Sequence, residues 1–319
     1  MRKKIGLISN PYSGWNKKHL HKVERLVKDE PQVLHLRLDN YQSLFDIMQV
    51  FSEHEIEFLV INGGDGTIQN VFTYLLNSDT FPDLPNIVLV NGGSANMLPK
   101  DTGLKKTPVR ALQDLLEWIE TGHPSLRILS RNILQVDYTD RDKKTLYGMF
   151  LGTGLIYRAV QIYRTSIEKF KLRGELNPLL TTLYAAYLFL FLKSKYLKLM
   201  KTNFSFKADP QSAESNYLFF LTTLNRLVLG ISPGKCRYQD KIKFVILRPG
   251  FYKFCRLFWF ILKNFFSIPD RSFNDFQCFN KIEFNPCAGF ILDGEIFEPA
   301  SKNSPVIVSK CEQLNFLTR

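Results

Sequence analysis

Residues 56–72 read IEFLVINGGDGTIQNVF. Phe58 to Ile61 form an unbroken apolar run, as a strand buried on both faces of a parallel sheet does. Three glycines follow at once: Gly63, Gly64 and Gly66. They let the main chain approach a ligand closely with its N–H groups, and Thr67 is the predicted N-cap of the helix that follows. Strand, glycine turn and helix N-terminus together predict an anion site, which phosphate commonly occupies.

The carboxylate of Asp65 stands among these glycines. It would repel a phosphate unless a cation lies between them or the carboxylate takes a proton from an attacking hydroxyl. Both interpretations point to phosphoryl transfer. The alternative is that Asp65 only hydrogen-bonds its own turn, as aspartate often does.

The first 122 residues alternate strand and helix patterns, which predicts a doubly wound parallel sheet with its ligand beyond the carboxyl ends of the strands. Strands are predicted at 4–9, 33–38, 56–61 and 86–90, and helices at 17–28, 43–52, from 67 onward and at 108–120. Glycine-rich or polar loops follow three of these strands, at 10–14, 63–67 and 91–96. We expect these three loops to converge on one crevice.

Beyond residue 122 the pattern changes to short strands, at 126–129, 133–138, 145–151, 218–224 and 241–247. These predict an antiparallel second domain, interrupted by a helical stretch near 155–200. Residues 183–192 are apolar but too short to span a membrane, so a core or pocket helix is expected there. Residues 251–266 contain eight aromatics, which suits either an interfacial membrane helix or a core helix.

The net charge differs between the two parts, and all five cysteines lie in the second part. Residues 1–122 carry 13 basic and 15 acidic residues, whereas residues 123–319 carry 29 basic and 15 acidic, a net charge of +14. The second part is therefore expected to meet an anionic partner, such as a membrane surface. The five cysteines are odd in number and lack CxxC spacing, which favours reduced thiols in a cytosolic protein and argues against a zinc site.

Five motifs in order resemble the diacylglycerol kinase and sphingosine kinase superfamily of lipid kinases, particularly its soluble bacterial type. They are Asn10-Pro11-Tyr12-Ser13-Gly14, Gly63-Gly64-Asp65-Gly66-Thr67, Gly93-Ser94-Ala95-Asn96, Gly152-Thr153-Gly154 and Asp293-Gly294-Glu295. The resemblance implies an α/β plus mainly β fold. A nucleotide domain like those of NAD kinases and phosphofructokinases would span 1–123, with 306–319 returning to it. An antiparallel β-sandwich with inserted helices, at 124–305, would take the lipid.

The resemblance also implies the site residues and the cofactors, ATP and Mg²⁺. Asp65, Asp293 and Glu295 would be catalytic, and Asp65 and Asp240 would hold metal. The nucleotide would be bound by Asn10, Ser13, Gly63, Gly64, Gly66, Thr67, Gly93, Ser94 and Asn96. Three positions depart from acidic residues common in the family: Met97, Ser130 (or Leu129) and Tyr157.

The leading hypothesis is an ATP-dependent lipid kinase, cytoplasmic and peripherally attached to an anionic membrane surface. A non-catalytic lipid-binding protein of the same fold is the alternative, because the three departures remove acidic groups. An NAD kinase is a third hypothesis, since the glycine motif is shared. A lipid substrate is the expected partner, nucleic acid is not, and a homodimer stays open. The identity of the lipid cannot be read from one sequence.

Overall fold

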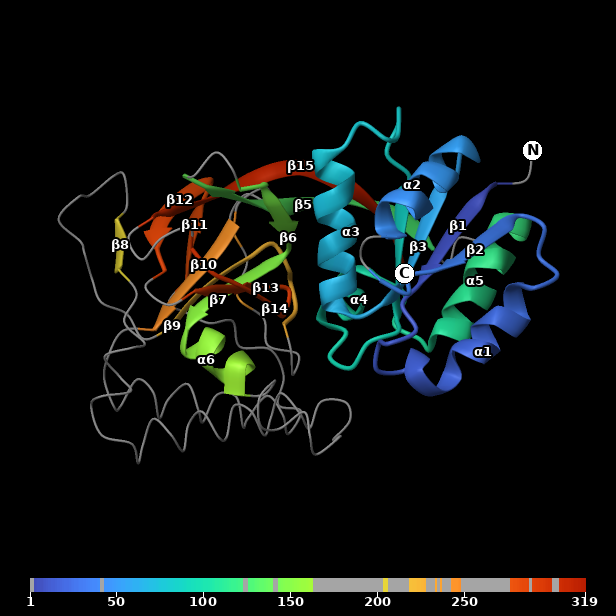
Figure 1. Cartoon of the computed structure of the whole chain (residues 1–319), viewed down its shortest axis with the longest axis horizontal. Helices are drawn as coiled ribbons and strands as arrows, with labels where there is room; N and C mark the ends of the chain where they lie inside the picture. Colours follow the sequence, from blue (N-terminus) through green and yellow to red (C-terminus); the bar gives the residue numbers. More distant parts are fainter. Residues whose placement is uncertain are drawn as a thin grey trace. The chain divides into compact units, whose positions relative to one another are not determined.

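The computed structural model describes residues 3–40, 43–122, 126–139, 143–162, 203–205, 218–227, 233, 236, 242–247, 276–286, 289–299 and 304–319. The chain divides into two compact units (Figure 1), one of Met1–Arg131 with Glu312–Arg319 and one of Asn132–Cys311. Each unit has its own hydrophobic core, so each is described separately.

A parallel sheet forms the centre of the first unit. Its order is β2 (Val33–Arg37), β1 (Ile5–Ser9), β3 (Phe58–Gly63), β4 (Asn86–Asn91) and the end of β15 (Val306–Thr318), which pairs with β4 at Phe316 and Ile87. The side chains of Phe58 to Ile61 are fully buried. Burying each such side chain contributes about 1.5–3 kcal/mol, which explains the apolar run.

Helices cover both faces of this sheet. On one face, α1 (Asn16–Val27) and α5 (Pro108–Thr121) pack on alternate residues of β1, β3 and β4. On the other face lie α2 (Ser43–Glu53) and α3 (Asp65–Asn77): a side chain at Gly6 would strike Phe51 of α2, and Phe72 of α3 contacts Phe316. The short helix α4 (Met97–Thr102) follows β4.

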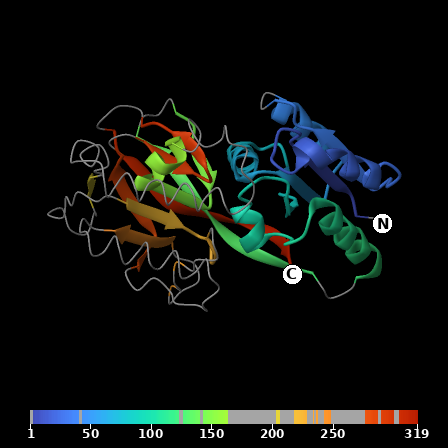
Figure 2. The same cartoon turned by 90° about the horizontal axis from the view of Figure 1, so that it is seen from below.

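The second unit contains two sheets that enclose one core. In the first, β12 (Lys281–Asn285) pairs with β8 (Asn203–Ser205) and β15, while β5 (Arg127–Tyr138) pairs with β15 and β6 (Leu146–Gly148) (Figure 2). The second is antiparallel, in the order β11 (Phe276–Phe279), β10 (Ile242–Leu247), β9 (Leu218–Thr222), β7 (Phe150–Gly154), β13 (Phe290–Leu292) and β14 (Glu295–Phe297). Helix α6 (Leu155–Ile162) packs on β7 and β13.

These observations confirm the predicted division into an α/β part with parallel strands and a mainly antiparallel β part. Three local predictions were wrong. The strands predicted separately at 126–129 and 133–138 are one continuous strand, β5. Helix α3 begins at Asp65 with Gly64 as its N-cap, so Thr67 lies inside the first turn. The strand predicted at 145–151 is broken into β6 and β7 at Met149, because Asp293 accepts hydrogen bonds from the N–H groups of Met149 and Phe150.

Several predictions fall on residues outside the described ranges: the helical stretch beyond Ile162, residues 183–192, residues 251–266 and Asp240. Among the helices of the described residues, none combines the length and the hydropathy that a membrane span requires.

The prediction of reduced cysteines is wrong for one pair. Cys236 and Cys278 form a disulfide, with their Cα atoms 6.0 Å apart and a sequence separation of 42. Cys278 lies on β11 and Cys236 precedes β10, so strand pairing brings together two residues that the sequence spacing does not relate. Cys311 forms no disulfide.

We expect Cys278→Ser to lower the free energy of unfolding by about 2–4 kcal/mol, because the bond restricts a long loop in the unfolded chain. Denaturant unfolding with and without a reductant measures this loss, and reduction should reproduce it in the unsubstituted protein. Cys311→Ser is the control and should change nothing. A non-reducing peptide map that leaves Cys236 and Cys278 in separate peptides would refute the disulfide.

Candidate active site

The three loops at the carboxyl ends of β1, β3 and β4 contact one another, as predicted. Asn10 Nδ2 of the first loop donates to Oγ1 of Thr67, the last residue of the second loop, at 2.9 Å. The Gly64 N–H donates to Ser13 Oγ at 3.1 Å. The third loop joins them because the Trp15 N–H donates to the Gly92 carbonyl at 3.0 Å. All three loops belong to the first unit, and these hydrogen bonds hold them together at one edge of the parallel sheet.

Several of the loop positions require glycine, because neighbouring atoms lie too close to leave room for a side chain. A Cβ at Gly93 would lie 2.5 Å from Gly64 Cα, and a Cβ at Gly63 would lie 2.7 Å from Thr67 Cβ. Gly64 differs: a Cβ there would have nothing nearer than Gly93 Cα at 3.6 Å, and its φ of −90° suits any residue. No steric contact in the fold requires glycine at 64, and its N-cap position also accepts other residues, whereas close approach of a ligand would require the absence of a side chain.

The polar side chains of the loops hydrogen-bond within the protein. Asn96 has a left-handed backbone with φ 51°, its Oδ1 accepts from the Gly93 N–H at 2.8 Å, and its Nδ2 donates to the Gly93 carbonyl at 3.0 Å. Asn10 Oδ1 likewise accepts from the Tyr12 N–H at 2.9 Å. Asn10, Thr67 and Asn96 therefore shape the loops, and the glycine backbone is the part suited to meet phosphate oxygens.

Asp65 is the first residue of α3, and its carboxylate connects the second loop to α4. Oδ2 accepts from the Met97 N–H and Oδ1 accepts from the Leu98 N–H, both at 3.0 Å. Burial raises the pKa of Asp65 above its ordinary value, and the two N–H donors and Lys100 offset part of this rise. A carboxylate whose pKa is raised accepts a proton more readily than one with the ordinary value.

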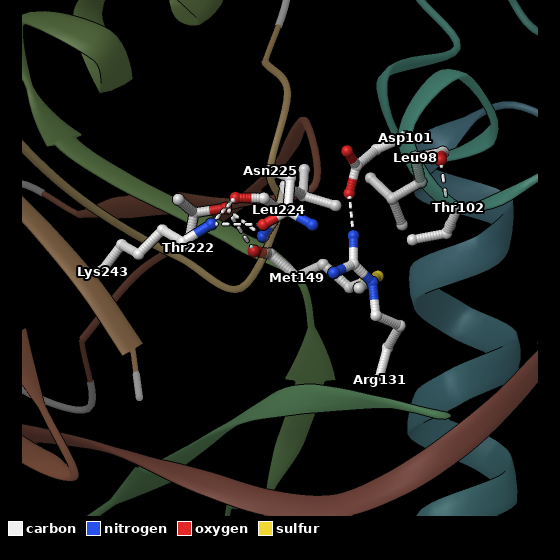
Figure 3. A network of polar contacts seen from close by, with 9 residues as sticks. All are labelled: Leu98, Asp101, Thr102, Arg131, Met149, Thr222, Leu224, Asn225 and Lys243. Atoms are coloured by element: carbon white, nitrogen blue, oxygen red, sulfur yellow. Dashed lines mark hydrogen bonds and ion pairs between the residues drawn. The ribbon is translucent and has the colours of Figure 1, made fainter. Parts of the chain in front are cut away.

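Helix α4 is also fixed at its other end (Figure 3). Arg131 Nη2 donates to Asp101 Oδ2 at 2.6 Å, and the two side chains are 16% and 3% exposed. Thr102 Oγ1 donates to the Leu98 carbonyl at 3.0 Å. An ion pair that is largely removed from water holds its geometry, because separating the partners leaves a buried charge. This pair therefore stabilises the backbone that binds Asp65.

Two buried asparagines beneath the loops were missed by the sequence reasoning. Asn16 Nδ2 donates to the carbonyls of Asn10 and Asn62, at 2.8 and 2.9 Å. Asn62 Nδ2 donates to Ser9 Oγ at 3.0 Å. A signal existed at Asn62, because an amide that directly follows a buried apolar strand must find a partner.

The Asp293-Gly294-Glu295 motif of the second unit is a tight hairpin. Leu292 pairs with Glu295 across a two-residue turn, in which Asp293 has φ 49° and Gly294 has φ 89°. Positive φ at both central residues is the geometry for which Asp-Gly is favoured. The Asp293-Gly294 dipeptide therefore has a structural reason in the hairpin, whatever its chemical role.

Asp293 also makes long-range bonds that a turn alone does not need. It is 1% exposed, and its Oδ2 and Oδ1 accept from the N–H groups of Met149 and Phe150, both at 2.9 Å. A Cβ at Gly148 would lie 2.5 Å from Asp293 Oδ2, so glycine permits this approach. Asp293 therefore supports the backbone, and the half-buried Glu295 is the carboxylate of this motif suited to chemistry.

The positions that depart from the family pattern have structural contacts. Met97 is buried and contacts Asp65 through its backbone N–H. Ser130 Oγ donates to Asn315 Oδ1 at 2.5 Å. Tyr157 is buried on α6, where a Cβ at Gly289 would lie 2.7 Å from its ring. Within the described part of the chain, no three His, Cys, Asp or Glu side chains cluster as metal ligands do.

The sequence and the fold were compared with those of known proteins. Residues 4–122 match the family model described as the diacylglycerol kinase catalytic domain. A crystal structure described as a diacylglycerol kinase from Bacillus anthracis str. Sterne is 15% identical with a TM-score of 0.66, covering 99% of this chain and 97% of that one. A second structure from the same organism is 16% identical with a TM-score of 0.64 and the same coverage. No curated protein sequence matches the chain.

The matched residues contain all three glycine-rich or polar loops and Asp65. At 15–16% identity the solved structures establish the fold alone, but they do so over nearly the whole length of both chains. The resemblance seen in the motifs is confirmed at the level of a match: residues 4–122 match the diacylglycerol kinase catalytic-domain model, and the whole chain shares the fold of the Bacillus anthracis structures.

Proposed function

We propose that the protein is a lipid kinase that transfers the γ-phosphate of ATP to the hydroxyl of a diacylglycerol-like or sphingoid-like lipid at a membrane surface. The main support for this proposal is Gly64. A side chain at Gly63 or Gly93 would clash with neighbouring atoms, whereas a Cβ at Gly64 would not, so no clash within the fold requires glycine there. A phosphate group approaching the backbone supplies the missing reason. The match of residues 4–122 to the diacylglycerol kinase family model supports phosphotransfer from ATP.

Asp65 is proposed as the group that takes the proton of the lipid hydroxyl or holds a metal ion. Both of its oxygens accept one N–H bond and keep a second lone pair for a further partner. Bound Mg²⁺ would neutralise charge that develops on the transferred phosphoryl group. Asp65 fits such a role as a single oxygen donor, and most of the catalysis would come from positioning and electrostatics.

Glu295 is proposed as the second carboxylate of the reaction. Its place directly after the Asp293-Gly294 turn is fixed by the hairpin and by the two N–H bonds to Asp293. Asp293 is assigned to holding this turn, because it is 1% exposed and both of its oxygens accept N–H groups of the β6–β7 backbone, whereas Asp65 is only partly buried. The role of Asp240 as a metal ligand stays a prediction, as do binding at a membrane surface and a homodimer.

The alternative is a lipid-binding protein of the same fold without turnover. It is favoured by one observation: Tyr157 and Met97 pack in the interior where many relatives have acidic groups. Asp65 and Glu295 are both retained, which favours the kinase.

Incubating the purified protein with γ-labelled ATP, Mg²⁺ and a panel of lipids in mixed micelles tests the proposal. We expect label in at least one lipid that carries a free hydroxyl, and none in the same lipid with that hydroxyl acetylated. Label in NAD would instead establish an NAD kinase. The absence of transfer to any acceptor, with retained binding to liposomes, would establish the non-catalytic alternative.

A further inference from the structure

A lysine is buried in the second unit. Lys243 lies on β10 and is 6% exposed, and its ammonium donates to the Leu224 carbonyl at 2.8 Å and to Asn225 Oδ1 at 2.6 Å (Figure 3). Thr222 is its cross-strand partner on β9, so both side chains lie on the same face of the sheet. Burying an ammonium group costs several kcal/mol unless its donors are satisfied. Because burial of Lys243 is costly, we expect its ammonium group to have a specific structural role.

A continuous path of hydrogen bonds leads from Lys243 to Asp293. After Lys243 donates to the Leu224 carbonyl, the Leu224 N–H donates to Thr222 Oγ1 at 3.0 Å. The Thr222 hydroxyl donates to the Met149 carbonyl at 2.8 Å. The Met149 N–H then donates to Asp293 Oδ2 at 2.9 Å. Figure 3 shows the first three of these bonds.

Every bond on this path donates in the same direction, from the cation toward the anion. The C=O and N–H groups of Leu224, and those of Met149, belong to adjacent peptide groups, so each bond fixes the position of the backbone that makes the next bond. Thr222 uses its hydroxyl both as donor and as acceptor, which a valine of the same shape cannot do. Replacing Thr222 with valine therefore removes the hydroxyl from the middle of the path and leaves the side-chain volume nearly unchanged.

We propose that Lys243 and Thr222 are positioning residues, which act through Met149 on Asp293 and so hold the hairpin that carries Glu295. This inference rests on the proposed function for its catalytic consequence, but the hydrogen-bond path can be tested without any turnover. Lys243 would set the loop after β9, Thr222 would transmit its position to Met149, and Asp293 would respond through its two N–H bonds.

Amide hydrogen exchange measured by NMR tests the path directly. We expect Thr222→Val to accelerate exchange of the Met149 and Phe150 amides about fivefold, which corresponds to the roughly 1 kcal/mol that one hydrogen bond contributes. Lys243→Met should accelerate the same two amides. Thr222→Ser keeps the hydroxyl and should match the unsubstituted protein, and amides of β1 should not change in any variant. Unchanged exchange at Met149 and Phe150 in Thr222→Val would refute the path.

Steady-state kinetics of lipid phosphorylation test the positioning role. Thr222→Val and Lys243→Met should each lower kcat about tenfold, leave KM for ATP within about twofold, and together cost no more than either alone. Thr222→Ser should restore kcat. Effects that multiply in the double variant, or a kcat that Thr222→Val does not change, would contradict the inference. If the unsubstituted protein phosphorylates no lipid, the proposed function fails, and the exchange experiment still decides whether the path exists.

Discussion

Replacing Asp65 with Asn is expected to lower the rate of lipid phosphorylation about a thousandfold, within the range that a general base contributes. The amide cannot take the proton, and it presents an N–H₂ group where one of the carboxylate oxygens accepts from Met97 or Leu98. One hydrogen bond is therefore lost, and we expect the free energy of unfolding to fall by about 1–3 kcal/mol. Turnover and denaturant unfolding measure the two effects separately.

The matched control for Asp65→Asn is Asp46→Asn, which removes an exposed carboxylate on α2 of the same unit. It should leave both turnover and stability unchanged. A loss of only about tenfold in Asp65→Asn, similar to the loss expected from the misplaced α4 backbone, would assign Asp65 a supporting role like that of Asp293. The proton would then have to be taken by Glu295 or by another group.

Much of the first unit could be predicted because its signals are local. The buried run at 58–61 and the glycines after it fix β3 and its turn, and the apolar spacing on α5 fixes the side that packs. The meeting of the three loops also follows from local information, since parallel strands end at one edge of a sheet. Thr67 was misassigned because Gly64 already provides the extended N-cap residue before α3.

The second unit was harder because its decisive contacts are long-range. Asp293 lies 144 residues from Met149, and the hydrogen bond between them breaks one predicted strand into two. Lys243 is the single charged residue of the otherwise apolar strand β10, and only the structure shows that it is buried and what it binds. The disulfide joins cysteines whose spacing carries no motif. None of these contacts leaves a pattern in the neighbouring sequence.

Replacing Gly64 with Ala is expected to abolish ATP binding while leaving the fold intact. The added Cβ meets nothing closer than 3.6 Å, and φ −90° with ψ 174° is ordinary for alanine, so the unfolding temperature should not fall. The same methyl group would occupy the space through which a phosphate approaches the loop backbone. We expect the Kd for ATP to rise at least a hundredfold, which corresponds to about 2.7 kcal/mol.

Gly93→Ala is the informative contrast to Gly64→Ala. Its Cβ would lie 2.5 Å from Gly64 Cα, which is backbone and cannot move aside cheaply. This variant should therefore lose stability as well as ATP binding. The pair separates a glycine that the fold requires from one that only a ligand requires.

Calorimetric titration of ATP into the unsubstituted protein and into Gly64→Ala tests most directly whether the three loops bind the nucleotide. We expect one ATP site in the unsubstituted protein, and in Gly64→Ala a folded protein with the same unfolding temperature and no measurable binding. Equal affinity for ATP in both proteins would contradict this expectation, because the open space at Gly64 would then have no part in holding phosphate.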